Sequence, residues 1–247
     1  MAVDDILLKD IPSIPECPIC DPKTMDDLLT GHNMIRRLFL QRPEQIRRNN
    51  ILIKFGEPNP PILLIRSGYA IRSCITPTGR RSIVDIFVPG DVCCIENAYT
   101  KYPTDEISSI GLTRFQAVTA SVFRSLFLQP PAALRIAAIL VEARFRIERA
   151  AALKILDARA RICVALFDLY ERLTWNGVIR EPRYYLPFTQ EQLGEYVGLS
   201  NVHVSRTLQR LDEDGIVRID HRLVSIENVE GLRECASGLP HGGQLPP

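Results

Sequence analysis

The spacing of hydrophobic and polar residues changes along the chain, and each change predicts a different kind of structure. Residues 25–48 have helical spacing. Between residues 50 and 123, short runs rich in β-branched and aromatic residues alternate with Gly- and Pro-containing turns at intervals of roughly 11 residues. This spacing is typical of an all-β roll or barrel. The β-rich runs lie at residues 51–55, 62–65, 69–75, 82–87 and 115–118.

Residues 131–155 have the spacing of one long helix with apolar residues on two sides. One stripe runs through Leu134, Ala138, Val141, Phe145, Ala152 and Ile155, and the other through Ile136, Ile139, Ala143, Ile147, Ala150 and Leu153. Such a helix needs two partners: its own β-domain and either the same helix of a second subunit or the rest of a large domain. On the remaining surface, the spacing predicts the ion pairs Glu142–Arg146 and Arg144–Glu148.

Residues 189–206 predict two helices joined by a tight turn. Thr189 is a suitable N-cap, and Gln192 completes a capping box. Gly198 fits the end of the first helix, where a left-handed backbone is easiest without a β-carbon. Ser200 caps the second helix, whose predicted inward stripe is Val204, Leu208 and Leu211.

The outer side of that second helix carries side chains suited to base edges. They are Asn201, Val202, His203, Ser205, Arg206, Gln209 and Arg210. Two β-rich runs follow at 216–219 and 223–226, and the turn between them predicts a hairpin. A further helix, at about residues 157–174, precedes the two helices of residues 189–206. Helix-turn-helix followed by a β-wing indicates DNA binding, the alternative being an ordinary helical hairpin with a solvated face.

Composition narrows the class of protein. The chain has 247 residues, which fits two domains, and its content of 46% hydrophobic and 24% charged residues is that of a globular protein. Net charge is only +1, so the arginines at 206, 210, 218 and 222 form a local basic edge rather than a generally basic protein. The chain contains no apolar run long enough for a transmembrane helix, and its start lacks a signal peptide. We therefore expect a cytoplasmic protein without a membrane partner.

The order of these elements resembles the CRP/FNR family of bacterial transcription regulators. The resemblance rests on residues 64–70, 78–81, 87–91 and, above all, 189–206, and it covers about 25–232. It implies an α+β fold with a cyclic-nucleotide-binding-like β-roll, a long dimerisation helix and a C-terminal winged helix-turn-helix domain. The implied domains are an irregular arm (1–24), a β-roll effector or sensor domain (25–130), the dimerisation helix (131–156), the DNA-binding domain (157–235) and a disordered tail (236–247).

The resemblance also implies partners and residue roles. It implies a homodimer that reads two half-sites of double-stranded DNA about 34 Å apart and contacts RNA polymerase. Arg206 matches the arginine that reads guanine, and Ser205 matches the position before it. Asn201 and His203 are candidates for base or phosphate contacts, and Thr189 and Gln190 for phosphate contacts, each with capping or solvent exposure as the alternative. Ser200 and Arg210 complete the expected DNA-binding set.

In two places the chain departs from the family pattern. Val202 stands where the best-known members have a glutamate that accepts from cytosine N4. We therefore expect a different half-site at one base pair, with a thymine methyl favoured. Ser108, Ser109 and Ile110 occupy the region where cyclic-AMP-binding members have a phosphate-clasping arginine, so cyclic AMP binding is not expected.

Cys17 and Cys20 form a CxxC motif, which suits a metal, an iron–sulfur cluster or a dithiol switch. Oxygen-sensing relatives have more cysteines in this arm and one in the β-domain, so Cys74, Cys93 and Cys94 could add ligands only by another geometry. The cofactor therefore stays open, with a thiol switch or inert thiols as alternatives to a cluster. A redox sensor or redox protein built on Cys17 and Cys20 is the alternative function.

The sequence lacks the motifs that would indicate other classes of function. A kinase or channel module would share the β-roll but not residues 189–226. The chain has no HExxH, P-loop or GxSxG motif, and its four histidines have no metal-ligand spacing. We expect a transcription regulator and not an enzyme.

Overall fold

The computed structural model describes residues 22–75 and 81–237. Cys17, Cys20 and the turn at 78–80 lie outside the described residues. The helices are α1 (Pro22–Leu40), α2 (Ala120–Arg124), α3 (Pro130–Ala152), α4 (Ala158–Trp175), α5 (Gln190–Val197), α6 (Asn201–Glu213) and α7 (Val229–Ala236). The short 3₁₀ turns are η2 (Ile95–Ala98), η3 (Ser125–Leu128) and η4 (Leu153–Ile155). The strands are β1 (Gln45–Arg48), β2 (Ile51–Ile53), β3 (Ile62–Ile75), β4 (Arg81–Phe87), β5 (Val92–Cys93), β6 (Glu106–Val118), β7 (Arg183–Tyr185), β8 (Val217–Asp220) and β9 (Leu223–Ile226).

The N-terminal half contains the expected antiparallel β-domain. Its strands run in the order β1-β6-β3-β4, with β2 paired to β6 and β5 paired to β3. Two strands are longer than the sequence predicts: β3 joins the runs 62–65 and 69–75, and β6 extends far upstream of 115–118. The bend in β3 requires Gly68, whose φ is 75° and whose added β-carbon would lie 2.2 Å from the Leu112 carbonyl oxygen.

The expected helix over 25–48 is wrong in its second half. Helix α1 ends at Leu40, and residues 45–48 form strand β1 against β6. Pro43 explains the break, because proline disfavours helical backbone at the residue before it and removes a helix donor. At the other end, the expected tail starts too early, because Ala236 is the buried last residue of α7.

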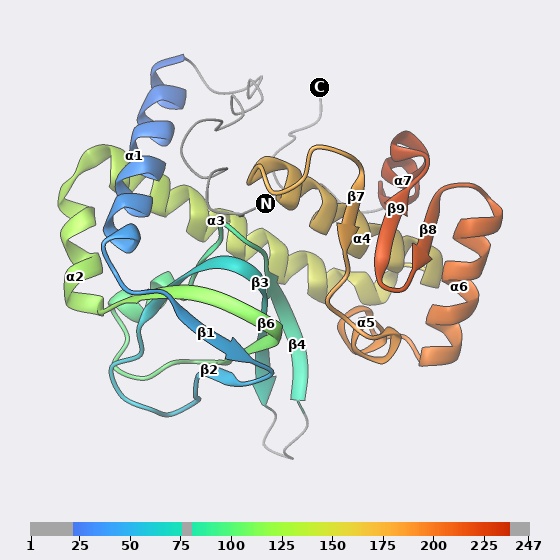
Figure 1. The fold of residues 1–247 in the computed structure, drawn as a ribbon, viewed down its shortest axis with the longest axis horizontal. Helices are drawn as coiled ribbons and strands as arrows, with labels where there is room; N and C mark the ends of the chain where they lie inside the picture. Colours follow the sequence, from blue (N-terminus) through green and yellow to red (C-terminus); the bar gives the residue numbers. More distant parts are fainter. Residues whose placement is uncertain (1–21, 76–80, 238–247) are drawn as a thin grey trace.

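Helix α3 links the two halves of the molecule (Figure 1). Ile136 and Leu153 from one predicted stripe are buried, whereas Val141, Phe145 and Ile155 from the other are exposed. Only one of the two predicted ion pairs is present, Arg144–Glu148 at 2.7 Å. The prediction for Glu142 and Arg146 is wrong, since each has a better-placed partner elsewhere.

Glu142 pairs with Arg135 at 2.9 Å. Arg146 donates to both carboxylate oxygens of Asp85 on β4, at 3.0 and 3.2 Å. Burial alone would raise the pKa of Asp85, but the guanidinium groups of Arg146 and Arg172 lower it overall. Arg146 therefore stays close to β4. The side of α3 that carries Arg146 packs against the β-domain of the same chain.

The C-terminal half is a helical domain with a small sheet, in which α4 is the central helix. Its strands run in the order β7-β9-β8, and β7 is absent from the sequence prediction. One apolar cluster is continuous from the β-roll, through α4, to α5, α6 and α7. Arg172 of α4 also pairs with Asp91 in the turn after β4, and Asn176 donates to the Pro89 carbonyl at 2.8 Å. These contacts fix the C-terminal half against the β-roll.

Candidate nucleic-acid interface

The predicted helix-turn-helix is present in the structure. The amide of Gln192 donates to Thr189 Oγ1 at 3.1 Å, and the amide of Thr189 donates to Gln192 Oε1 at 3.0 Å. These two bonds confirm the capping box. Gly198 ends α5 with a φ of 71°, and Ser200 accepts from the His203 amide at the start of α6. The local sequence therefore sets where both helices begin and where the first one ends.

Helix α6 has one buried and one exposed side. Val204, Leu208 and Leu211 face the core, as the spacing predicts. Figure 1 shows α6 at the outer edge of the molecule, far from the β-roll. Every residue predicted to contact DNA is exposed: Thr189, Gln190, Ser200, Asn201, His203, Ser205, Arg206 and Arg210. The structure therefore leaves all of these side chains accessible to a partner, with Thr189 and Gln190 lining one hollow beside α6 and Arg210 lining another.

Gly194 allows α5 and the turn to approach each other closely. A β-carbon at this position would lie 2.5 Å from the Leu199 carbonyl oxygen and 3.3 Å from Val204. The Leu199 amide in turn donates to the Gly194 carbonyl at 2.8 Å. Sequence reasoning missed this residue, because a glycine inside a helical pattern gives no signal of which neighbour needs the space.

Arg161 of α4 is a second residue that the sequence did not reveal. Its guanidinium donates to the carbonyls of Leu156 at 2.8 Å, Lys154 at 2.7 Å and Gly198 at 3.1 Å. One side chain therefore ties the end of the long-helix segment to the turn between α5 and α6. Because guanidinium geometry is rigid, this contact helps to fix the angle at which α6 is presented.

The basic groups of this surface differ in how they are neutralised. Arg218 on the wing donates to Asp212 at 2.9 Å, so its charge is partly compensated. Among residues 22–75 and 81–237, no carboxylate forms an ion pair with Arg206 or Arg210. Within that part of the chain, Arg222 on the wing donates only to the Pro187 carbonyl, at 3.4 Å. Three of the four arginines of the predicted basic edge, Arg206, Arg210 and Arg222, are therefore available to an anionic partner.

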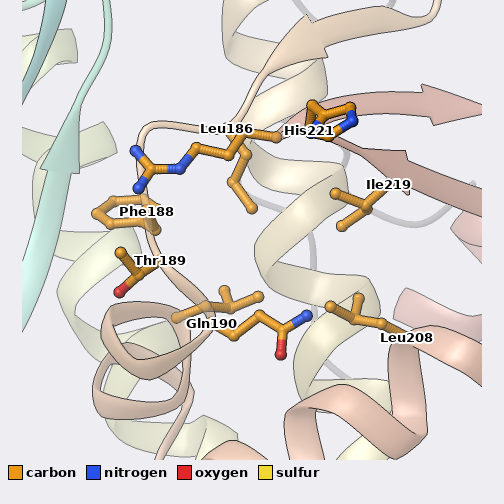
Figure 2. A pocket seen from close by; sticks show the side chains of 9 residues that line it. Leu186, Phe188, Thr189, Gln190, Leu208, Ile219 and His221 are labelled. Atoms are coloured by element: carbon orange, nitrogen blue, oxygen red, sulfur yellow. The ribbon is translucent and has the colours of Figure 1, made fainter.

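An open hollow lies between α5, α6 and the wing. Figure 2 shows Thr189 and Gln190 at the start of α5, His221 on the wing, and the apolar side chains of Ile219 and Leu208 nearby. The wing tip is a two-residue turn, with φ of 44° at His221 and 70° at Arg222. This turn places both side chains beside the beginning of α5. The predicted phosphate contacts at Thr189 and Gln190 thus gain two neighbours that the sequence analysis left outside the site.

The effector region of the β-roll holds a cation that the sequence analysis missed. Arg72 on β3 is buried and lies 2.8 Å from a Glu96 oxygen and 3.6 Å from an Asp105 oxygen. Residues 108–110 of β6, the region on which the expectation from the sequence rests, carry no arginine, and Arg72 lies outside that region. The cation comes from β3 and not from β6, where Ser109 bonds to the backbone of Asn50. Two carboxylates of the chain itself neutralise it.

Within the two described ranges, no three His, Cys, Asp or Glu side chains gather closely enough to hold a metal ion. The described helices include no single helix with the length and apolar character needed to cross a membrane.

The described cysteines of the β-roll differ in exposure: Cys93 and Cys94 are buried, and Cys74 is exposed on β3. The predicted CxxC pair, Cys17 and Cys20, lies outside the described residues, so its role stays a prediction.

Comparison with known proteins supplies an independent line of evidence. Residues 160–235 match the Crp-like helix-turn-helix domain family. The transcriptional activator protein anr of Pseudomonas aeruginosa is 23% identical over 232 residues, covering 92% of this chain and 91% of that protein. The fumarate and nitrate reduction regulatory protein of Escherichia coli K12 is 21% identical over 200 residues, covering 80% and 79%. The structure of FixK2 from Bradyrhizobium japonicum matches with a TM-score of 0.70 at 21% identity, covering 81% of this chain and 99% of that one.

The fold and this surface define a transcription regulator with a helix-turn-helix DNA-binding domain and a cyclic-nucleotide-binding-like β-domain. The match over residues 160–235 shows a Crp-like helix-turn-helix domain, and the chain as a whole is similar to regulators of the CRP/FNR family, in agreement with its sequence motifs.

Proposed function

We propose that the protein is a homodimer that binds a two-fold symmetric DNA site through α6, independently of cyclic AMP. The observation that carries the proposal is Arg206, which is exposed on the outer side of α6 without a carboxylate partner among the described residues. Arginine can donate to O6 and N7 of guanine at once, which makes it the commonest reader of that base. We assign the base contacts to Arg206, Ser205, Asn201 and His203.

Phosphate contacts would surround this base-reading set. Thr189 and Gln190 lie at the beginning of α5, where the helix dipole favours an anion, although the backbone N–H of Thr189 is already donated to Gln192. Ser200 and Arg210 flank the two ends of the exposed side of α6. His221 lies on the wing, across the hollow from Thr189 and Gln190 (Figure 2), and Arg222 lines the same hollow. A backbone phosphate at the hollow would meet donors from both elements, which fixes the register of α6 on the duplex.

The second copy of the chain would pack on the exposed apolar stripe of α3 and the following turn η4. Val141, Phe145 and Ile155 are at least half exposed, at 51%, 50% and 81%. A contiguous apolar stripe on a helix that is already packed on its other side is typical of a subunit interface. Pairing of two α3 helices about a two-fold axis would place one α6 on each side. Such a dimer would act in the cytoplasm and contact RNA polymerase at its promoters.

Selection of bound sequences from random duplexes with the purified full-length protein tests this proposal. We expect an inverted repeat whose half-site centres are one helical turn apart, each with a preferred guanine. Val202 is 59% exposed at the start of α6 and cannot accept a hydrogen bond from cytosine. We therefore expect one pair of the half-site to differ from the usual family sequence, with thymine favoured there. Recovery of sequences without symmetry would contradict the proposal, and the usual half-site at full preference would contradict the role of Val202.

Cyclic AMP should not bind in the β-roll. Its phosphate would need a cation, and the buried guanidinium in this region, Arg72, is already paired with Glu96 and Asp105. A cyclic phosphate would have to compete with both carboxylates for this one guanidinium, and it would lie beside their negative charges. Isothermal titration of the protein with cyclic AMP should give no saturable heat. Binding with micromolar affinity would refute this part of the proposal.

A further inference from the structure

All three guanidinium nitrogens of Arg161, in the first turn of α4, donate to backbone carbonyls. Nε donates to Leu156 at 2.8 Å, Nη2 to Lys154 at 2.7 Å and Nη1 to Gly198 at 3.1 Å. These carbonyls lie at the end of η4 and at the end of α5. Carbonyls at the end of a helix lack a partner inside the helix, and a positive charge beside them is favourable. Arg161 thus satisfies the ends of two separate elements at once.

The first two carbonyls flank a residue of the proposed subunit interface. Ile155 lies between Lys154 and Leu156, and it is 81% exposed in the single chain. The proposed dimer covers this side chain with the second copy. Because Arg161 holds the carbonyls on both sides of Ile155, it fixes the backbone at the end of the interface.

The third carbonyl belongs to the turn that leads into α6. Gly198 ends α5, and Ser200 caps the beginning of α6. A β-carbon added to Gly198 would lie 3.5 Å from Nη1 of Arg161, so the guanidinium also packs against the turn itself. One rigid, planar group therefore joins the end of the proposed interface to the start of the helix that carries Arg206.

A different set of contacts holds the other end of α4. Arg172 pairs with Asp91 in the β-roll. Asn176, which follows α4, donates to the Pro89 carbonyl at 2.8 Å. These contacts join α4 to the β-roll, whereas those of Arg161 join it to the interface. If only the contacts of Arg161 were lost, the DNA-binding domain could pivot about the end of α4 that the β-roll holds.

We propose that Arg161 is a positioning residue that sets the half-site spacing selected by the dimer. This inference rests on the proposed dimer and its two-fold symmetric DNA site. Two linked binding modules gain affinity from each other only when their geometry allows both to bind at once. One added base pair moves the second half-site by about 3.4 Å and rotates it by about 34° around the duplex axis. A fixed angle between the interface and α6 therefore favours one spacing, and a loosened angle admits its neighbours.

Two variants of Arg161 separate this role from others. Lysine keeps the charge but donates from a single nitrogen, so Arg161→Lys cannot hold three carbonyls in the geometry of a guanidinium. Arg161→Gln removes the charge as well. Base reading by α6 is retained in both variants, so affinity for a duplex with one half-site should change less than about twofold.

The test is DNA affinity as a function of half-site spacing, measured by fluorescence anisotropy with the full-length protein. Three duplexes carry two copies of the selected half-site, at the selected spacing, one base pair shorter and one base pair longer. A fourth duplex carries one half-site. We expect the unaltered protein to bind the selected spacing at least about tenfold more tightly than either neighbour. In Arg161→Lys and Arg161→Gln this ratio should fall at least about fivefold.

The matched control is an arginine that donates to a backbone carbonyl elsewhere. Arg124 at the end of α2 donates to the Ala98 carbonyl at 2.7 Å, inside the N-terminal half. Arg124→Lys should leave the spacing ratio unchanged. Circular dichroism checks the fold of each variant, and Arg161→Gln carries the test if Arg161→Lys unfolds.

The possible contrary results are distinguishable. An unchanged spacing ratio in the Arg161 variants would overturn the inference and leave the proposed function intact. Equal loss of affinity for every duplex in Arg161→Gln, with a weaker dependence on salt, would show that Arg161 contacts phosphate instead. An unaltered protein that binds two half-sites no better than one would overturn the proposed function, and this inference with it.

Discussion

Replacement of Arg206 with alanine should nearly abolish sequence-specific DNA binding while the protein stays folded. Loss of a bidentate contact to guanine costs about 1–3 kcal/mol of discrimination at each half-site. A symmetric site contains two such contacts, so affinity for the selected duplex should fall at least about 30-fold. Arg206 is exposed and forms no ion pair with a described residue, so the free energy of unfolding should change little. Fluorescence anisotropy on the selected duplex, with a scrambled duplex beside it, measures the effect.

Two variants control this experiment. Arg206→Lys keeps the positive charge but removes the planar guanidinium group that donates two parallel hydrogen bonds. This variant should retain binding to the scrambled duplex and lose preference for guanine. Arg233→Ala removes an exposed arginine from α7, which lies outside the predicted surface and pairs with Glu230. It should bind the selected duplex like the unaltered protein. Unchanged preference for guanine in Arg206→Ala would show that another residue reads the base.

Replacement of Phe145 with aspartate should convert the proposed dimer to monomers. A carboxylate in the middle of an apolar subunit interface is desolvated without a partner, and two copies face each other across a two-fold axis. We expect dimer dissociation to rise at least about a hundredfold, and DNA affinity to fall with it because one half-site alone remains. Sedimentation velocity over a concentration series measures the change in assembly.

The matched control introduces the same charge at another exposed phenylalanine. Phe55 in the β-roll is 59% exposed, close to the 50% of Phe145, and it is far from α3 in sequence. Phe55→Asp should leave the dimer and its DNA binding intact. A dimer that survives Phe145→Asp but not Phe55→Asp would place the interface on the β-roll and contradict the role given to α3.

Features that depend on local chain chemistry could be predicted from the sequence. Thr189, Gln192, Gly198 and Ser200 mark the ends of α5 and α6 by capping and backbone preference, which neighbouring residues alone decide. The inward stripe of α6 follows from helical spacing in the same way. The Crp-like helix-turn-helix match over 160–235 agrees with that local evidence.

Features that depend on contacts distant in sequence could not be predicted in this way. Arg146 has the right spacing to pair with Glu142, but the buried carboxylate of Asp85 offers a bidentate contact from 61 residues away. Strand β1 forms because β6 offers a register for it, although Gln45–Arg48 contains little β-rich sequence. Arg72 and Arg161 likewise acquire their contacts only when separate elements meet.

The most direct test of paired recognition helices is methylation interference on the selected duplex. Methylation of guanine N7 blocks the atom to which Arg206 is proposed to donate. We predict interference at one guanine in each half-site, with the two half-sites one helical turn apart, and loss of that pattern in the residual binding of Arg206→Ala. Interference at a single half-site, or an unchanged pattern in Arg206→Ala, would contradict the account.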